Sequence, residues 1–488
     1  MKEELYGKLK EVEFIPFEIE NLSKKQLINK EIFEYINTVE DVVEREQIII
    51  KLEERAKELG CLSSFRKILK QYIKDSTRLT KLTHNEIAEM LLQENSLAIY
   101  ENNLYIYVDG IYKLDIKSIE RKIIEIVPNA NSHLREEVCK YLELKNDIYM
   151  QQNNESNIIN FKNGLYNLKE KKMYAHTPNF FSINQINVNY KENARVVTEV
   201  DDFLNKISNY NIQRKQTILE MIGYSMTTSM KFQKAFILYG ETARNGKSTL
   251  LTVITKLIGE ENVGNVSLRD ISTNRFAGSG IQGKILNTCS EMTEEILKDI
   301  SFFKALIGGD NVEVEKKFKD RKTISQYAKF IFCANALPHV ADKTNGFYRR
   351  LHIIPFERSF TDEEVKDFDI DKILTNDALE YLAKISLDAY MKMNGTFSNY
   401  EESEKEVNKY KMKSNSILAF INDAPNIKLI YERNIFPKAQ TIYDCYVKYC
   451  QYNGLKAVGR NTFYDEIEKS EKVTVKNHNH QKYYIFKL

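Results

Sequence analysis

The stretch Gly240-Glu-Thr-Ala-Arg-Asn-Gly-Lys-Ser-Thr249 decides the fold of this 488-residue chain. It follows an apolar run, Ala235–Tyr239, and precedes a helical pattern that ends at Gly259. Strand, glycine loop, Lys-Ser pair and helix in this order predict a phosphate-binding loop. Backbone N–H groups of such a loop and of the helix N-terminus can cradle phosphate oxygens.

Two side chains in this loop carry the expected nucleotide chemistry. Lys247 would reach the β- and γ-phosphates, and the Ser248 hydroxyl would ligate Mg²⁺. The loop is one residue longer than the usual pattern. Either the loop itself is longer, or Glu241 occupies its first position. The residues expected to bind ATP and Mg²⁺ are Gly240, Asn245, Gly246, Lys247, Ser248 and Thr249.

The region around the loop favours an α/β fold. From about 213 to 390, short apolar strands alternate with amphipathic helices, a pattern typical of a parallel sheet covered on both faces. The expected strands are Ala235–Tyr239, Ile285–Cys289, Phe330–Ala334 and Leu351–Ile354.

A phosphate loop of this kind needs an acid at the end of a neighbouring strand and a group that orients the attacking water. Glu291 follows one expected strand and Asn335 follows the next. We expect Glu291 to hold Mg²⁺ and Asn335 to lie beside the γ-phosphate. The competing acids Glu294 and Glu295 fit a solvated helix face better, and an Asn at a strand end often only starts a turn.

Two adjacent arginines, Arg349 and Arg350, directly precede the last expected strand. Arginines beside a buried strand need partners. A structural salt bridge is one interpretation, and an arginine finger that reaches the next subunit's ATP is the other.

These motifs together resemble the superfamily 3 helicases of the AAA+ class, and specifically the primase-helicases of the poxvirus and satellite-phage type. Upstream, Phe161–Gly164 and His176–Pro178 are similar to the domain that precedes the ATPase in that family. No primase segment with zinc ligands or a carboxylate cluster is evident in the N-terminal part. The matching motifs, in order, are Asn245–Thr249, Glu291, Lys304–Asp310, Lys329–Pro338 and Phe347–Phe356.

The resemblance implies a magnesium-ATP site, a homo-hexameric ring, movement on single-stranded DNA, and Arg350 as a finger acting in trans. Two features depart from the family. Its second motif often carries an acid pair, whereas this chain has Ser290-Glu291. The longer phosphate loop is the other departure.

A lysine-rich hairpin is expected between Asp310 and Lys329, with Val312 and Val314 on one strand and Ile324 on the other. Cations neutralise phosphates and an aromatic ring can stack on a base, which suits single-strand binding. In the resembling family this hairpin projects into the ring channel. A solvated turn is the alternative. The tip residues are Lys317, Phe318 and Lys319.

The C-terminal segment reads as helix, helix and hairpin, the order of a winged helix. Such a domain would bind duplex DNA, here the origin duplex. A packing domain without DNA contact is the alternative. The residues placed to face a groove are Arg460, Asn461 and Tyr464.

Composition limits the remaining possibilities. Lys+Arg 71 against Asp+Glu 69 gives a net charge of +2, which excludes an acidic tail protein and a uniformly basic coat. The six cysteines lack zinc-ligand spacing, and no apolar run is long enough to cross a bilayer, so we expect a cytoplasmic protein without membrane partners. The expected domains are an N-terminal helical segment (1–61), a small α/β module (62–212), the AAA+ ATPase (213–395) and a winged-helix-like domain (396–488).

Local signals predict further elements. A helix is expected over Thr38–Leu59, with Thr38 as its N-cap and Gly60 ending it. Asp109-Gly110 and Asn163-Gly164 predict hairpin turns.

The function expected is an ATP-dependent DNA helicase that initiates replication of a phage, satellite or other mobile element. One alternative is an origin-binding protein whose ATPase controls assembly, and another is a P-loop enzyme acting on a small molecule.

Overall fold

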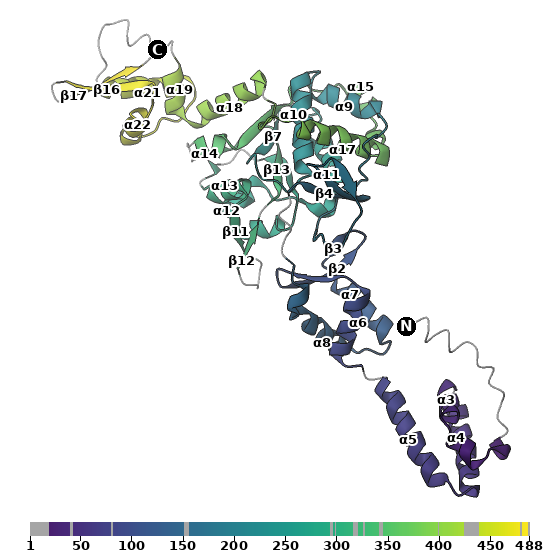
Figure 1. Cartoon of the computed structure of the whole chain (residues 1–488). Helices are drawn as coiled ribbons and strands as arrows, with labels where there is room; N and C mark the ends of the chain where they lie inside the picture. The colour runs from purple at the N-terminus through teal and green to yellow at the C-terminus, as the bar shows by residue number, and fades with distance from the viewer. Residues whose placement is uncertain are drawn as a thin grey trace. The chain divides into compact units, whose positions relative to one another are not determined.

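The computed structural model describes residues 19–39, 42–79, 82–150, 156–292, 296–297, 299–315, 321–325, 327–340, 345–398, 400–423, 439–478 and 481–486. The chain divides into two compact units (Figure 1). The first comprises residues 1–97, 102–104 and 115–148, and the second comprises 98–101, 105–114 and 149–488. None of the described helices combines the length and apolar surface that a bilayer crossing requires.

The first unit is helical. Its N-terminal helices pack around a core that includes Phe33, Leu52 and Phe65. Thr38 is the last residue of α3, so its predicted role as N-cap of the next helix is wrong: the helical periodicity continues across it from the preceding turn. Gly60 does end α4, with a φ of +63° that other residues rarely adopt. The helices are α2 Lys24–Leu27, α3 Lys30–Thr38, α4 Val42–Glu58, α5 Leu62–Leu79, α6 His84–Glu94, α7 Ile116–Ile126 and α8 Ser132–Glu143.

Two small antiparallel sheets precede the central parallel sheet in the chain. Both predicted turns are confirmed: Asp109 and Gly110 have φ values of +54° and +83°, and Gly164 opens the strand after the second turn. The strands are β1 Leu97–Tyr100, β2 Asn103–Val108 and β3 Ile111–Lys113 in one sheet, and β4 Ile158–Phe161, β5 Gly164–Asn167 and β6 Lys172–Tyr174 in the other.

A five-stranded parallel sheet forms the centre of the second unit, in the order β15-β7-β13-β9-β8. The predicted α/β fold with a parallel sheet is therefore confirmed. Two of the sheet's strands, β7 and β13, are labelled in Figure 1. Strand β9 runs three residues beyond its expected end, so Glu291 lies within the strand and not after it. The strands are β7 Ala235–Tyr239, β8 Val263–Gly264, β9 Leu286–Met292, β13 Lys329–Ala334 and β15 Leu351–Pro355.

Alternation along each strand divides the core between the two faces of the sheet. Phe236 and Leu238 belong to one apolar cluster with α10, α11 and α17, whereas Ala235 and Ile237 belong to another with α12 and α13. The helices of this region are α9 Thr198–Ile207, α10 Ile212–Ser225, α11 Lys247–Ile258, α12 Leu268–Thr273, α13 Ser301–Gly308, α14 Asn345–Tyr348, α15 Asp362–Asp367, α16 Ile370–Ile373 and α17 Asn376–Met391.

The predicted hairpin is present, with β11 Asn311–Val314 antiparallel to β12 Lys322–Ser325 and Val312 opposite Ile324. A further two-residue pair joins β10 Ile296–Leu297 to β14 His339–Val340. Helix α18, Glu401–Ser414, packs on the central sheet, since the Ser403 hydroxyl donates to the backbone oxygen of Ile353 at 2.6 Å.

The last elements share a core of their own, which includes Phe420, Tyr446 and Phe463. The elements are α19 Ser416–Asn422, α21 Ala439–Tyr452, α22 Arg460–Ile467, β16 Val473–His478 and β17 Gln481–Phe486. The predicted order of two helices and a hairpin is present as α21, α22 and the β16–β17 pair, and α19, which was not predicted, precedes them.

Candidate nucleotide site and DNA hairpin

The phosphate loop lies at the carboxyl end of β7, directly before α11. Gly246 adopts a φ of +85°, which a side chain would strain. Gly240 is required by close approach: a Cβ there would lie 2.5 Å from the backbone oxygen of Phe356. Glu241 does not replace Gly240, because its exposed side chain accepts a hydrogen bond from the Tyr239 hydroxyl at 2.8 Å. The extra residue therefore lengthens the loop.

Lys247 is the centre of the site. Its ammonium donates to the backbone oxygen of Gly240 at 2.8 Å, to that of Thr242 at 3.3 Å, and to Oδ1 of Asn335 at 2.9 Å. Burial lowers the pKa of Lys247 from its ordinary value. The structure thus brings together two of the predicted site residues, Lys247 and Asn335, which are 88 positions apart in the sequence.

Other contacts hold the loop in place, some within the loop and some from the segment after β15. The Asn245 amide donates to the backbone oxygen of Thr242 at 2.7 Å, which closes the loop on itself. Arg244 pairs with Asp362, and the Phe360 N–H donates to the backbone oxygen of Arg244 at 2.7 Å. No local pattern indicates these contacts, because Asp362 is 118 positions from Arg244.

The expected magnesium ligands have exposed side chains. Ser248 stands in the first turn of α11, and Thr249 follows it. Glu291 is exposed near the carboxyl end of β9, where Met292 is level with Ala334 of β13. A hydroxyl and a carboxylate are oxygen donors of the type that Mg²⁺ prefers, so these residues fit the ion. The competitors Glu294 and Glu295 lie outside the described residues.

A second acid, Asp270, lines a cavity of about 380 Å³ together with Glu291. The sequence motifs did not predict it. Asp270 lies in the first turn of α12, whose N-cap is Ser267. The Asp270 backbone N–H donates to Oγ of Ser267 at 3.0 Å, and the Ser267 hydroxyl donates to the Asp270 carboxylate at 2.7 Å. Burial is the largest cause that raises the pKa of the Cys289 thiol, and the charges of both acids raise it further. A hydrogen bond with the backbone of Glu291 lowers it in part. The spacing of Asp270 to Glu291 carries no motif that could have revealed this proximity.

The two adjacent arginines differ in burial. Arg349 is exposed, whereas Arg350 is partly buried and donates from Nη1 to the backbone oxygen of Gly346 at 2.7 Å. Nε of Arg350 has no hydrogen-bond partner among the described residues. Burial, and then the charge of Arg349, lower the pKa of the Arg350 guanidinium. A finger acting in trans stays a prediction, because the structure holds one chain.

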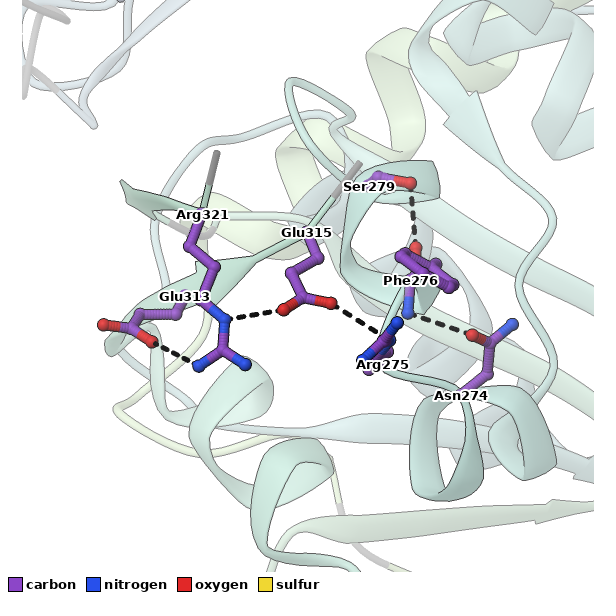
Figure 2. A network of polar contacts seen from close by, with 7 residues as sticks. All are labelled: Asn274, Arg275, Phe276, Ser279, Glu313, Glu315 and Arg321. Atoms are coloured by element: carbon purple, nitrogen blue, oxygen red, sulfur yellow. Dashed lines mark hydrogen bonds and ion pairs between the residues drawn. The ribbon is translucent and has the colours of Figure 1, made fainter. Parts of the chain in front are cut away.

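The loop end of the hairpin carries a row of charges, shown in Figure 2. The Glu315 carboxylate lies between Arg321, at 2.6 Å, and Arg275, at 3.1 Å. Glu313 approaches Arg321 only to 3.8 Å. Farther along β12, Lys322 pairs with Glu101 at 3.0 Å. The predicted tip residues Lys317, Phe318 and Lys319 lie outside the described residues.

The three C-terminal candidates are placed on α22. Arg460 and Asn461 are exposed, with the Arg460 guanidinium 5.3 Å from the ring centroid of Tyr443. Tyr464 takes part in packing: its hydroxyl donates to the backbone oxygen of Ala439 at 2.7 Å, and its ring stacks on Tyr484. Only the first two therefore present most of their side chains to solvent.

Three family models match separate segments of the chain. A family model described as D5 N terminal like matches residues 64–209, and one described as Poxvirus D5 protein-like matches residues 412–487. Residues 238–350 match a family of unknown function, DUF5906. The chain is therefore similar to D5-like proteins over two separate segments. The resemblance seen in the sequence motifs is thus confirmed.

The curated relative and the solved structures that this chain matches are distant in sequence. The putative helicase L207/L206 of Acanthamoeba polyphaga mimivirus is 24% identical over 218 residues, which cover 42% of this chain and 22% of that protein. The match therefore spans about a fifth of the relative's length. Among solved structures, an A form apo structure of the NrS-1 C-terminal region has a TM-score of 0.50 at 13% identity, covering 83% of this chain and 99% of that one. A second A form structure of that region, residues 305–718, has a TM-score of 0.50 at 11% identity, covering 82% and 98%. This likeness shows the fold.

Proposed function

We propose that the D5-like chain is an ATP-dependent DNA helicase of viral or mobile-element replication. The proposal rests on one observation. Lys247 of the phosphate loop donates a hydrogen bond to Asn335 at the carboxyl edge of a parallel sheet. Ligands of open α/β sheets bind at that edge. The family match and the name of the mimivirus relative support the helicase reading.

Each site residue has a definite part in ATP hydrolysis. Loop N–H groups and the N-terminus of α11 bind phosphate oxygens, and Lys247 neutralises charge on the β- and γ-phosphates. Ser248 and Glu291 would hold Mg²⁺, which supplies further charge neutralisation when bound. Asn335, already fixed by Lys247, orients the attacking water with its amide.

The hairpin between β11 and β12 is the proposed DNA-contacting element. Lys317 and Lys319 would neutralise phosphates of a single strand, and Phe318 would stack on a base or sugar. Six such tips in a homo-hexameric ring would concentrate positive charge that the net charge of +2 conceals. In that ring, Arg350 of one subunit would complete the ATP site of the next.

The C-terminal elements are proposed to form a winged-helix-like domain that binds origin duplex DNA. Arg460 and Asn461 are exposed on α22, the helix that would enter the groove. This arrangement also supports the alternative function, an origin-binding protein whose ATPase controls assembly without processive unwinding.

Substitution of Lys247 tests the proposal directly. Lys247→Ala should abolish ATP hydrolysis and strand displacement, because it removes the charge that faces the phosphates. Lys256→Ala, on the exposed end of the same helix, should leave both activities intact. Hydrolysis by the wild type without strand displacement, together with ATP-dependent assembly on origin duplex, would favour the alternative. Near-normal turnover in Lys247→Ala would remove the phosphate-loop assignment.

A further inference from the structure

A separate basic cavity of about 540 Å³ opens at the amino ends of β7 and β15. Lys234 directly precedes β7, Arg349 lies just before β15, and Lys411 comes from α18. The phosphate loop lies at the carboxyl end of β7, so the two sites are at opposite edges of the sheet. Arg350 is not among the residues that line the cavity.

The three cations of the cavity repel one another. Burial lowers the pKa of Lys234 first, and the charges of Lys411 and Arg349 lower it further. The Lys234 ammonium donates to the backbone oxygen of Arg349 at 2.5 Å, and the Lys411 ammonium lies 5.8 Å from the ring centroid of Tyr348. One carboxylate, Glu404, is among the described residues of the lining. The cavity therefore has a surplus of positive charge.

A buried imidazole adds a second, independent feature. His352 lines the cavity, is only 7% exposed, and has no hydrogen-bond partner for its Nε2 among the described residues. Buried polar atoms without partners are rare in proteins and call for an explanation. The rings of Phe236 and Phe397 flank the imidazole, each with its centroid at 5.8 Å, and fix its orientation.

We propose that this cavity is a second anion site, which binds a compact polyphosphate such as the triphosphate chain of a nucleotide. Lys234, Arg349 and Lys411 would neutralise the chain, and Nε2 of His352 would donate to one phosphate oxygen. A compact ligand fits because the cations converge on one cavity; a nucleic-acid strand would need them spread along its path. The assignment goes beyond the proposed helicase function, which uses the opposite edge of the sheet.

Binding of tripolyphosphate to a Lys247→Ala chain tests the site without interference from the phosphate loop. Titration calorimetry should detect binding, and the added pair Lys234→Gln and Lys411→Gln should weaken it at least tenfold, since two charge-assisted contacts are lost. The control pair Lys366→Gln and Lys392→Gln, on exposed surface, should leave the affinity unchanged.

The pKa of His352 offers a second measurement, because it would not change on ligand addition if the imidazole were only structural. In the same Lys247→Ala chain, tripolyphosphate should raise the pKa of His352, followed by NMR of the ring, because a bound anion favours the imidazolium. If the double variant fails to fold, the single Lys411→Gln variant carries the comparison.

Three outcomes would overturn the assignment: no tripolyphosphate binding to the Lys247→Ala chain, equal affinities of the cavity and control variants, or displacement of tripolyphosphate by an oligothymidylate at equal phosphate concentration. The first two exclude the site, and the third exchanges the compact ligand for a DNA strand. Because phosphate-loop activity plays no part in these measurements, they are independent of whether the wild type is a helicase.

Discussion

At the scale of single residues, Lys247 donates all three of its N–H groups to protein oxygens. Two of these acceptors are neutral backbone carbonyls of the loop. Phosphate oxygens are stronger acceptors because they are charged, so a nucleotide should take over those two hydrogen bonds. The bond to Asn335 can persist, and it would then link the state of the phosphate to the end of β13.

Arg350 is predicted to act on the ATP site of a neighbouring subunit. Arg350→Ala should lower ATP turnover by about 10³-fold, the range found for arginine fingers. When the variant is mixed with wild type, ATP turnover should fall by more than the fraction of mutant subunits. A steady-state ATPase assay at several mixing ratios would show this. The exposed Arg195→Ala serves as control. Inhibition strictly proportional to the mutant fraction would place Arg350 in its own subunit's site or in none.

His352 makes the stability of the sheet region sensitive to acid. Burial and the Lys234 charge lower the pKa of His352 from 6.5 to about 3. Below pH 6.5 the unfolded chain binds a proton that the folded chain excludes, so stability falls as the pH falls toward 3. At pH 5 the loss is about 2 kcal/mol.

His352→Phe should therefore shrink the difference in unfolding free energy between pH 7 and pH 5 by about 2 kcal/mol. A phenylalanine ring can pack against the neighbouring aromatic rings in place of the imidazole. Removal of Nε2 breaks no hydrogen bond, because this atom has no partner among the described residues. Urea unfolding at both pH values measures the effect, with the exposed His133→Gln as the comparison. Equal acid sensitivity in His352→Phe and wild type would show that other groups dominate.

At the scale of elements, opposite charges pair where the hairpin strands enter the loop. Arg275 and Arg321 are 72% and 66% exposed, while Glu315 between them is 18% exposed. Exposed ion pairs of this kind contribute little to stability, about 0.2–1 kcal/mol. Their larger effect is on the local potential, because Glu315 neutralises two cations next to the predicted DNA-binding tip.

Glu315→Gln should therefore strengthen single-strand binding and steepen its salt dependence by roughly 0.7 per added phosphate contact. Glu313→Gln should change both less, since Glu313 lies farther from Arg321. Lys319→Ala should act in the opposite direction and reduce strand displacement while sparing basal ATPase. Salt-titrated fluorescence anisotropy with a single-stranded oligonucleotide separates the three variants. Unchanged affinity in both Glu315→Gln and Lys319→Ala would exclude the hairpin from DNA contact.

At the scale of the whole molecule, the C-terminal elements have a separate core, whereas α18 belongs with the central sheet. Truncation after Ser414 retains α18, so the ATPase region should stay folded. The truncated chain should lose affinity for an origin duplex and keep hairpin-dependent binding to single strands. Parallel binding assays with both DNA forms check this. A simultaneous loss of both affinities would mean that the C-terminal segment supports the ATPase fold itself.

Local patterns in the sequence determined the elements of this protein. The apolar run before Gly240, the glycine loop and the helix to Gly259 were predictable, because each depends on neighbours a few residues apart. Alternation likewise predicted the hairpin strands that carry Val312, Val314 and Ile324, although their register comes from the structure. The failure at Thr38 has a local cause too: a residue suited to cap a helix can equally end the one before.

Only the tertiary structure decided which side chains meet. The order β15-β7-β13 places Asn335 beside Lys247, and the chain's return after β15 brings Asp362 to Arg244. The basic cavity likewise joins residues from the starts of two strands and from a helix far along the chain. Periodicity carries no information about strand order, since each of these strands is apolar on both faces and would be buried equally well at another place in the sheet.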